Sequence, residues 1–455
     1  MKNIENNNIE NDFKNFINEM SKRYEIFPYL NIENDKNNYL KVPYSSPYWD
    51  NTEIIAIMKS IFFGKWLASG EDVKKFEKKF AQKINEKYGL MVNSGSSANL
   101  LMISAIKKIL SWNNQDEIIV SPVAFPTTIS VIPQNNLVPV FVDIELESLN
   151  INIDLIENKI TDKTRAIFLS PVLGNTPDLD IILDICKKYN LKLILDGCDS
   201  LGSKWKGKYL NEYAIATSDS LYASHHLCTG EGGVITSNRE DIIKYARNLA
   251  FWSRDCYCQG AENLLPNGMC KMRFSPWLKE NGCDTIIDHK YVFTGELGYS
   301  LKPLDLQGSI GLVQLQKLDE IIEKRKLHKN RIHNIFKEEL GDLVYIPNGL
   351  KDAETSWFGV PIIVRDEIFD GAAMIAAKDK KISLVKHLEA NGIQTRNYFA
   401  GNILLHRGYQ HLDDYKKYPN ANRVLDEVFF IGCHPSYNEK TFDYIRTVLK
   451  SWRNT

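Results

Sequence analysis

The chain has 455 residues, more than one hydrophobic core usually organises, so we expect a large domain and a smaller one. Hydrophobic residues make up 44% and charged residues 25%, as in a soluble globular protein, and the net charge of −1 predicts neither nucleic acid nor an anionic membrane as a partner. No apolar run approaches the roughly 20 residues that span a bilayer, and residues 1–11 lack the apolar stretch of a secretory signal. We therefore expect a cytoplasmic protein with reduced thiols.

The first elements predicted along the chain are helical. Residues 1–40 are polar and rich in Asn, which indicates a loosely attached helical extension, and the pattern from Glu53 to Phe80 is helical as well. Short apolar runs then alternate with helical stretches such as 98–110 and 179–189. The predicted strands are 89–92, 117–120, 138–143, 165–170, 192–196, 218–223 and 233–237. This alternation predicts an α/β fold with a mainly parallel sheet, in which ligands gather beyond the carboxyl ends of the strands.

The last third of the chain is of a different kind. A long helical stretch runs from Pro303 through Lys326, and helices mixed with short strands follow it to Thr455. We therefore divide the chain into a large domain of residues 41–325 and a smaller C-terminal α+β domain of residues 326–455.

Three segments carry residues suited to chemistry. The turn from Asn93 to Asn99 has small residues before a helix and suits a phosphate, although a capped helix start would look the same. Asp196 ends a predicted strand, where a carboxylate can hold a cationic ring nitrogen or simply close a turn. The pair His225 and His226 precedes a glycine-rich turn and suits metal ligands, a base or a surface loop.

Taken together, these segments resemble the DegT/DnrJ/StrS superfamily of sugar aminotransferases and dehydratases, which use vitamin B6 on nucleotide-linked keto sugars. The matching stretches also include 64–70 (Gly-Lys-Trp-Leu-Ala-Ser-Gly) and 125–128 (Phe-Pro-Thr-Thr). The resemblance implies the type I fold of pyridoxal-phosphate-dependent transferases, with a mainly parallel central sheet, and a homodimer. It also implies a set of residues that bind the cofactor: Gly95, Ser96, Phe125, Asp196 and Ser220.

His225 stands where aminotransferases of this superfamily carry the lysine that forms the Schiff base. Imidazole cannot form that imine, so the cofactor is expected as untethered pyridoxamine phosphate, with His225 as the catalytic base. Loss of the lysine could instead mark an inactive protein. Sugar 3-dehydratases of the superfamily make the same replacement, which favours removal of a hydroxyl over decay.

The cysteines extend the resemblance to the 3-dehydratases that act on CDP-4-keto-6-deoxyglucose and carry a 2Fe–2S cluster. Cys198 follows Asp196 by two residues, and 57 residues separate it from the pair Cys256 and Cys258, as in that group. The fourth cysteine departs from the pattern of that group. Eleven residues separate Cys258 from Cys270, whereas about seven stand there in the group. The implied ligands are Cys198, Cys256, Cys258 and Cys270, in an iron–sulfur loop of residues 252–275, with Cys283 as the alternative fourth ligand.

The resemblance also implies partners. A nucleotide-linked 4-keto-6-deoxy sugar is the expected substrate, and an NAD(P)H-dependent flavin or iron–sulfur reductase, or a ferredoxin, the expected electron donor. Arg396 and Asn402 lie in a stretch that resembles one closing on the nucleotide-sugar, whereas Ser300 replaces an Asn that reaches the neighbouring subunit's cofactor in many relatives. Two alternatives stay open: a cluster-free 3-dehydratase that regenerates its cofactor with glutamate, and a non-catalytic iron–sulfur or partner-binding relative.

Overall fold

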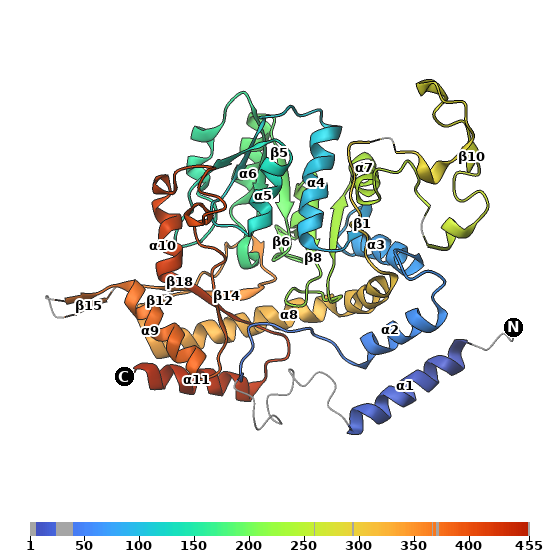
Figure 1. The fold of residues 1–455 in the computed structure, drawn as a ribbon. Helices are drawn as coiled ribbons and strands as arrows, with labels where there is room; N and C mark the ends of the chain where they lie inside the picture. The colour runs from blue at the N-terminus through green and yellow to red at the C-terminus, as the bar shows by residue number, and fades with distance from the viewer. Residues whose placement is uncertain are drawn as a thin grey trace.

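The computed structural model describes residues 6–23, 40–258, 260–293, 295–365, 367–369 and 373–453. Its centre is a seven-stranded sheet with the order β1-β9-β8-β5-β4-β2-β3, in which β9 alone runs against the other strands (Figure 1). The strands are β1 (Tyr88–Val92), β2 (Glu117–Val120), β3 (Val138–Phe141), β4 (Thr164–Leu169), β5 (Lys192–Asp196), β8 (Thr217–Ser220) and β9 (Gly233–Ser237). The predicted mainly parallel α/β fold is confirmed.

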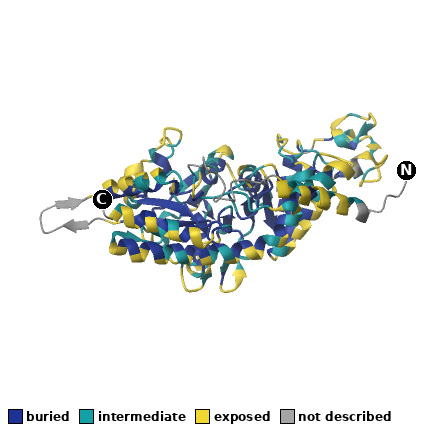
Figure 2. Ribbon diagram, turned by 90° about the horizontal axis from the view of Figure 1, so that it is seen from below, coloured by how far each residue is buried: buried dark blue, intermediate teal, exposed yellow. Residues whose placement is uncertain are grey.

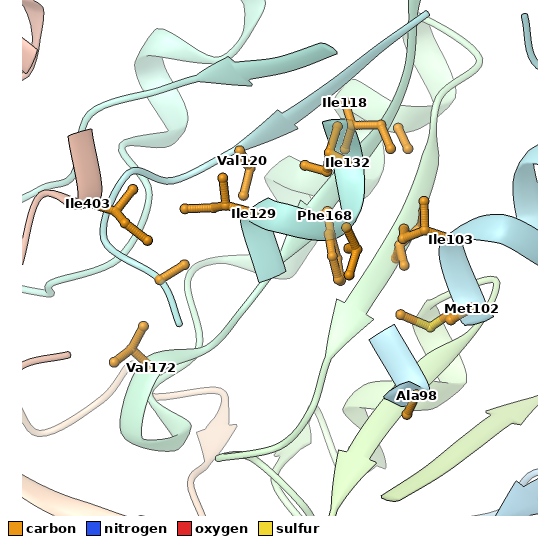
Figure 3. Close-up of a cluster of buried hydrophobic side chains, with 14 of the residues drawn as sticks. Ala98, Met102, Ile103, Ile118, Val120, Ile129, Ile132, Phe168, Val172 and Ile403 are labelled. Atoms are coloured by element: carbon orange, nitrogen blue, oxygen red, sulfur yellow. The ribbon is translucent and has the colours of Figure 1, made fainter. Parts of the chain in front are cut away.

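Helices cover both faces of this sheet because side chains alternate along each strand. One face packs against α4 (Gly95–Ile109), α5 (Pro126–Gln134) and α7 (Glu240–Ala250), and Figure 3 shows part of this core. The other face packs against α3 (Glu71–Lys83), α6 (Leu179–Lys188) and the first half of α8 (Asp305–Leu340). In β2, Ile118 and Val120 belong to the first core whereas Ile119 belongs to the second. The result is a three-layer arrangement with a buried sheet. Figure 2 shows the buried residues in the interior and the exposed ones on the outer sides of the helices.

The C-terminal part has its own antiparallel sheet with the order β12-β14-β18-β17. The helices α9 and α11 and the second half of α8 pack on it. Its elements are β12 (Val344–Tyr345), β14 (Gly359–Val364), β17 (Thr395–Asn397), β18 (Val428–Gly432), α9 (Ala377–Ala390), α10 (Pro419–Glu427) and α11 (Glu439–Arg453). Smaller pairs complete the strands: β6 (Lys204–Trp205) with β7 (Lys208–Tyr209) and β13 (Ala353–Glu354), β10 (Phe274–Ser275) with β11 (Ile287–Asp288), and β15 (Glu367–Phe369) with β16 (Ala373–Ile375).

Helix α8 links the two parts and is longer than the sequence predicted. It continues past Lys326 to Leu340, so the predicted boundary at residue 325 falls inside a helix. Leu318 and Ile321 belong to the core shared with α3, whereas Ile332 and Phe336 belong to the core of the C-terminal sheet. One continuous helix therefore contributes its two halves to two cores.

The N-terminal region adds two helices, α1 (Asn6–Arg23) and α2 (Asn51–Phe63). They pack on each other, with the rings of Phe13 and Phe62 5.1 Å apart and the Asn51 amide donating to Asn18. The helical part of the predicted extension is therefore present, while residues 24–39 lie outside the described residues. Among the helices described, none combines the length and the apolar character needed to cross a membrane.

Candidate active site

A cavity of about 580 Å³ lies at the carboxyl edge of the central sheet. Each strand there ends in a polar or small residue: Ser94 and Gly95 follow β1, Asp196 ends β5, and Ser220 ends β8. The C-terminal part closes the opposite side with Phe358 among others. Because β1, β5 and β8 run in the same direction, residues from distant parts of the chain meet at this edge, as expected for an α/β fold.

The first wall of the cavity is the N-terminus of α4. Ser94 is its N-cap and accepts a hydrogen bond from the N–H of Ser97 at 3.1 Å, while the first N–H groups of a helix have no partner inside it. Gly95 is required here, since a Cβ at this position would lie 2.8 Å from the Cβ of Ser220. Gly95, Ser96 and Ser220 all line the cavity. Together they form a cradle suited to a phosphate group.

Asp196 is buried, and two side chains hold its carboxylate in one orientation. Its Oδ2 accepts hydrogen bonds from the Asn99 amide at 2.8 Å and from the Thr128 hydroxyl at 2.6 Å. Asn99 is held in turn by the hydroxyl of Ser218, which donates to its Oδ1 at 2.5 Å. A carboxylate held in one orientation suits pairing with a protonated ring nitrogen.

The sequence analysis predicted no role for Asn99 or Thr128, although both lie in motifs on which the family resemblance rests. Only folding brings them from α4 and α5 to the same oxygen atom of Asp196. Phe125, 48% exposed and next to the edge of the Phe399 ring, offers an apolar ring at the cavity. An anion cradle, an oriented carboxylate and an aromatic ring form a set that fits pyridoxal or pyridoxamine phosphate.

His225 lies in the loop between β8 and β9 and lines the cavity. Its Nδ1 is 2.7 Å from the carbonyl oxygen of Cys198. A carbonyl can only accept, so Nδ1 carries the hydrogen and Nε2 keeps a free lone pair. Burial lowers the pKa of His225 to about 4, so the ring is neutral at neutral pH. His225 is therefore ready to act as a base.

The neighbouring His226 has a different environment. It is 2% exposed, and its Nε2 lies 3.3 Å from the carbonyl oxygen of Ser356. Burial lowers the pKa of His226 well below its usual value, so this ring stays neutral and structural. Of the two histidines, only His225 lines the cavity.

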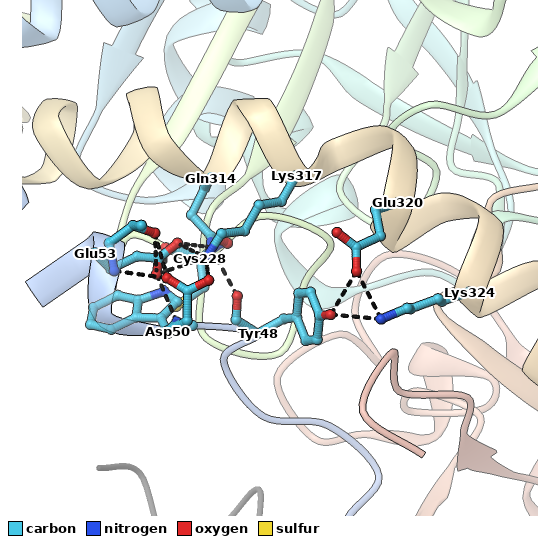
Figure 4. Close-up of polar contacts among 10 residues, drawn as sticks. Tyr48, Asp50, Glu53, Cys228, Gln314, Lys317, Glu320 and Lys324 are labelled. Carbon is cyan, nitrogen blue, oxygen red and sulfur yellow. Dashed lines mark hydrogen bonds and ion pairs between the residues drawn. The ribbon is translucent and has the colours of Figure 1, made fainter. Parts of the chain in front are cut away.

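The loop that carries His225 is tied to α8 and to the chain before α2 (Figure 4). The N–H of Cys228 donates to Gln314 Oε1 at 3.1 Å, and its carbonyl accepts from the indole of Trp49 at 3.0 Å. The amide of Gln314 also donates to Glu53, which is fully buried and paired with Lys317 at 2.7 Å. A buried polar network on α8 thus holds the backbone three residues beyond His225.

The two residues predicted to contact the nucleotide-sugar differ in location. Arg396 lines the cavity, and its guanidinium lies 4.2 Å from the centre of the Tyr44 ring. Asn402 is fully buried, accepts from the N–H of Leu404 at 3.0 Å and donates to Asn422 at 2.7 Å. Asn402 thus caps a turn and does not line the cavity, and its contact with the nucleotide-sugar stays a prediction.

The predicted cluster ligands are divided between two places. Cys198 lines the cavity, and burial raises the pKa of its thiol well above the usual value. Cys256, Cys258 and Cys270 lie in the segment that carries β10, which projects beside α3 and α7 (Figure 1). Cys258 Sγ accepts from the N–H of Met269 there, and the exposed Cys270 donates to Asn267.

These four residues therefore do not form a cluster site within one chain. In the part of the chain that the structure describes, no three His, Cys, Asp or Glu side chains are grouped so as to hold a metal ion. The alternative ligand Cys283 hydrogen-bonds with Thr285, which lowers the pKa of its thiol. The arrangement does not fit a 2Fe–2S cluster bound by four cysteines of a single chain.

Comparison with known proteins identifies the family of this chain. Residues 49–450 match the model of the DegT/DnrJ/EryC1/StrS aminotransferase family. The lipopolysaccharide biosynthesis protein RfbH of Salmonella typhimurium is 32% identical, with 84% of each chain covered. The dTDP-4-dehydro-2,6-dideoxy-D-glucose 3-dehydratase of Saccharopolyspora spinosa is 34% identical, covering 83% of this chain and 79% of the relative.

A solved structure of similar architecture is that of a GDP-4-keto-6-deoxymannose-3-dehydratase with a trapped PLP–glutamate geminal diamine. It has a TM-score of 0.75 at 30% identity and covers 90% of this chain and all of that one. The central sheet with its helices is therefore the type I fold of pyridoxal-phosphate-dependent enzymes. The chain belongs to the DegT/DnrJ/EryC1/StrS aminotransferase family.

Proposed function

We propose that this protein is a pyridoxamine-phosphate-dependent dehydratase that removes the hydroxyl at carbon 3 of a nucleotide-linked 4-keto-6-deoxyhexose. One observation carries the proposal: His225 lines the cavity beside Asp196, and no lysine is among the described residues that line it. An aminotransferase of this fold needs a lysine there to tether the aldehyde form of its cofactor. The relatives named as 3-dehydratases support the same reaction.

The proposal assigns the following roles to the side chains. Gly95, Ser96 and Ser220 hold the cofactor's phosphate, and Asp196 pairs with the ring nitrogen in the orientation that Asn99 and Thr128 impose. When bound, the cofactor supplies an amine that condenses with the sugar ketone and a ring that takes up electrons.

His225 moves the proton in this scheme. Its Nε2 would accept the proton that the reaction releases, while Nδ1–H stays on the Cys198 carbonyl. The bound cofactor would supply the electrons that let the hydroxyl leave from sugar carbon 3. Because burial lowers its pKa to about 4, His225 is in its neutral, proton-accepting form at neutral pH.

Arg396 and a second subunit complete the proposal. The guanidinium of Arg396 at the cavity suits the diphosphate of a nucleotide-sugar, because arginine binds phosphate oxygens in pairs. We propose a homodimer, as the family resemblance implies. Ser300, which stands where many relatives have Asn, is exposed, and its backbone forms an isolated antiparallel β-bridge with Phe251. We propose CDP as the nucleotide of the substrate. Because two relatives are named as dehydratases of dTDP- and GDP-linked sugars, those sugars are the substrates to compare it with.

Replacing a hydroxyl by hydrogen at carbon 3 consumes two electrons and two protons and releases water. One source is a partner reductase or ferredoxin acting through the 2Fe–2S cluster predicted on Cys198, Cys256, Cys258 and Cys270. The separation of Cys198 from the other three cysteines gives this route no assembled site in one chain, so no step is assigned to a cluster. The same separation favours a second candidate, in which glutamate is oxidised to its keto acid and supplies the two electrons, and its amino group is released as ammonium.

Mass spectrometry of the sugar product tests the reaction. The protein is incubated with cofactor and the CDP-, dTDP- or GDP-linked 4-keto-6-deoxyhexose, once with glutamate and once with a reductase and NADPH. We expect a product that has lost one hydroxyl oxygen in at least one arm, and the productive arm identifies the electron source. A product that has gained an amino group would contradict dehydration and establish transamination.

Iron analysis tests the cluster separately. The protein is purified and reconstituted without oxygen, and its iron content and visible absorbance are compared with those of Cys256→Ser, Cys198→Ser and the control Cys283→Ser. Two irons per chain that are lost in both Cys256→Ser and Cys198→Ser would establish the four-cysteine site and require a rearrangement of the loop. Iron-free protein that dehydrates with glutamate would establish the cluster-free candidate.

A further inference from the structure

Asp199 is a buried carboxyl group three residues beyond Asp196, and the roles assigned above do not use it. It is 6% exposed and lines the cavity. Its Oδ2 accepts a hydrogen bond from the N–H of Leu173 at 3.0 Å. Leu173 stands in a tight turn after β4 with a φ of +52°, an uncommon conformation for a branched residue. One oxygen of Asp199 is therefore held by a turn of defined backbone shape.

The other oxygen of Asp199 faces His225. Its Oδ1 lies 3.6 Å from His225 Nδ1, the same nitrogen that is 2.7 Å from the Cys198 carbonyl. The Nδ1 edge of the ring thus meets two acceptors from consecutive residues of one turn. The ring of Phe358 lies 5.1 Å from the imidazole at a tilt of 31°, and the buried Arg325 donates to the Phe358 carbonyl at 2.8 Å. Backbone and side chains therefore restrict the tilt of the imidazole ring. They also fix that its Nδ1 edge is the one that faces the two acceptors.

We propose that Asp199 is a positioning residue that acts through His225 in the dehydration proposed above. With the Cys198 carbonyl, it holds the hydrogen on Nδ1 and turns the unprotonated Nε2 to the reacting carbon. Its carboxyl also lies beside the ring when Nε2 has taken the proton. A carboxyl next to a catalytic histidine does this work in serine proteases, where it sets the tautomer and orientation of the imidazole. Asp196 is not available for it, because Asn99 and Thr128 hold that carboxylate.

A purely structural Asp199 would only anchor the turn at Leu173. Its replacement would then change folding, cofactor binding and turnover together, and the effect would not depend on His225. A positioning residue changes turnover alone, and its effect disappears when His225 is absent, because the two residues act as one unit.

The variant Asp199→Asn tests this distinction, since it keeps the size of the side chain and an oxygen for Leu173. We expect kcat to fall by about 100-fold or more, with KM and the affinity for pyridoxamine phosphate within about threefold of the wild type. In a His225→Asn background the same change should cost nothing further. An unchanged kcat, or an equal loss in both backgrounds, would overturn the proposal. If Asp199→Asn does not fold, Asp199→Ser takes its place in the same cycle.

Nitrogen-15 NMR of histidine-labelled protein provides a readout that needs no turnover. The chain has nine histidines, and comparison with His225→Asn assigns the signal of interest. We expect His225 in the wild type to carry its hydrogen on Nδ1, and Asp199→Asn to increase the fraction with hydrogen on Nε2. A wild-type ring with hydrogen on Nε2 refutes the positioning role. This measurement reads the same in a protein that dehydrates no sugar, so failure of the proposed function is recognised separately.

Discussion

His225 combines two properties that a lysine at the same place cannot combine. It forms no imine with the cofactor, and its Nε2 is unprotonated at neutral pH because burial lowers its pKa to about 4. The hydrogen bond from Nδ1 to the Cys198 carbonyl fixes which nitrogen is free. In the proposed reaction, the residue would support proton abstraction in a site that holds the cofactor by non-covalent contacts alone.

Replacing His225 by lysine tests this directly. We expect His225→Lys to lose dehydration by at least about 1,000-fold, within the range attributed to a general base, and to bind pyridoxal phosphate as an imine. Product formation by mass spectrometry and the imine absorbance are the measurements. The exposed His411→Lys is the matched control and should retain full activity. Undiminished dehydration in His225→Lys would remove the base role from this residue.

Thr128 gives a second prediction at the residue scale. Its hydroxyl is one of two side-chain donors to Asp196 Oδ2, and a hydrogen bond to a charged group contributes roughly 1.5–3 kcal/mol. Thr128→Val keeps the shape and removes this donor, so we expect the cofactor to bind about tenfold more weakly. Titration with pyridoxamine phosphate, followed by fluorescence, measures the change. The exposed Thr447→Val should bind like the wild type, and equal affinity of both variants would contradict the role of Thr128.

At the scale of elements, α8 determines where the His225 loop lies. Glu53 is fully buried at the start of α2 and is satisfied by Gln314 and Lys317, and Gln314 also accepts from the N–H of Cys228 (Figure 4). A buried charge that loses its partner is costly. The network therefore couples the stability of the α2–α8 contact to the geometry of the active-site loop.

A pair of lysines on α8 tests this coupling. Lys317→Met leaves Glu53 without its counter-charge, and we expect a loss of roughly 3 kcal/mol in the free energy of unfolding. Lys324→Met, on the same helix, removes an exposed pair with Glu320 and should cost less than about 1 kcal/mol. Denaturant titration of both variants gives the comparison. Equal losses would show that the Glu53 pair contributes no more than a surface ion pair.

At the scale of the whole molecule, stability depends on carboxyl groups buried near the sheet. Glu86 is 6% exposed; its Oε1 accepts from Asn211, and its Oε2 has no hydrogen-bond partner among the described residues. Burial raises the pKa of Glu86 to about 7, and the nearby Glu212 adds to the rise. The folded protein therefore binds this proton more tightly than the unfolded chain does.

The sign of the pH dependence follows from that difference. The contribution of protonated Glu86 is complete below its ordinary pKa of 4.5 and is lost as the pH rises through about 7. Glu86→Gln removes this loss, so the melting temperature of the variant relative to the wild type should rise between pH 5 and pH 8. The largest change in the free energy of unfolding that this pKa shift can cause is roughly 3 kcal/mol, at about 1.4 kcal/mol per pKa unit. A difference in melting temperature that is the same at both pH values would contradict this assignment.

The sequence predicted the fold well because its signals are local. Strands 117–120, 192–196 and 233–237 have the predicted bounds, since each is a short apolar run closed by polar or turn residues. The strand predicted for 218–223 ends at Ser220, because the following residues turn into the loop of His225. The helix predicted for 303–326 continues to Leu340, since its second half packs on a sheet built from residues far along the chain.

For the site, the sequence supplied the residue types, and the family resemblance predicted their roles: a phosphate-binding turn at Gly95, a carboxylate for the ring nitrogen at Asp196 and a base at His225. Which of these groups meet depends on how the chain folds. The tertiary structure brought Thr128 and Asp199 to these residues, moved Asn402 into a buried cap, and separated Cys198 from the loop cysteines. The physical reason is that hydrogen bonds and metal sites require contacts within a few ångströms between residues distant in sequence, and spacing along the chain does not contain those distances.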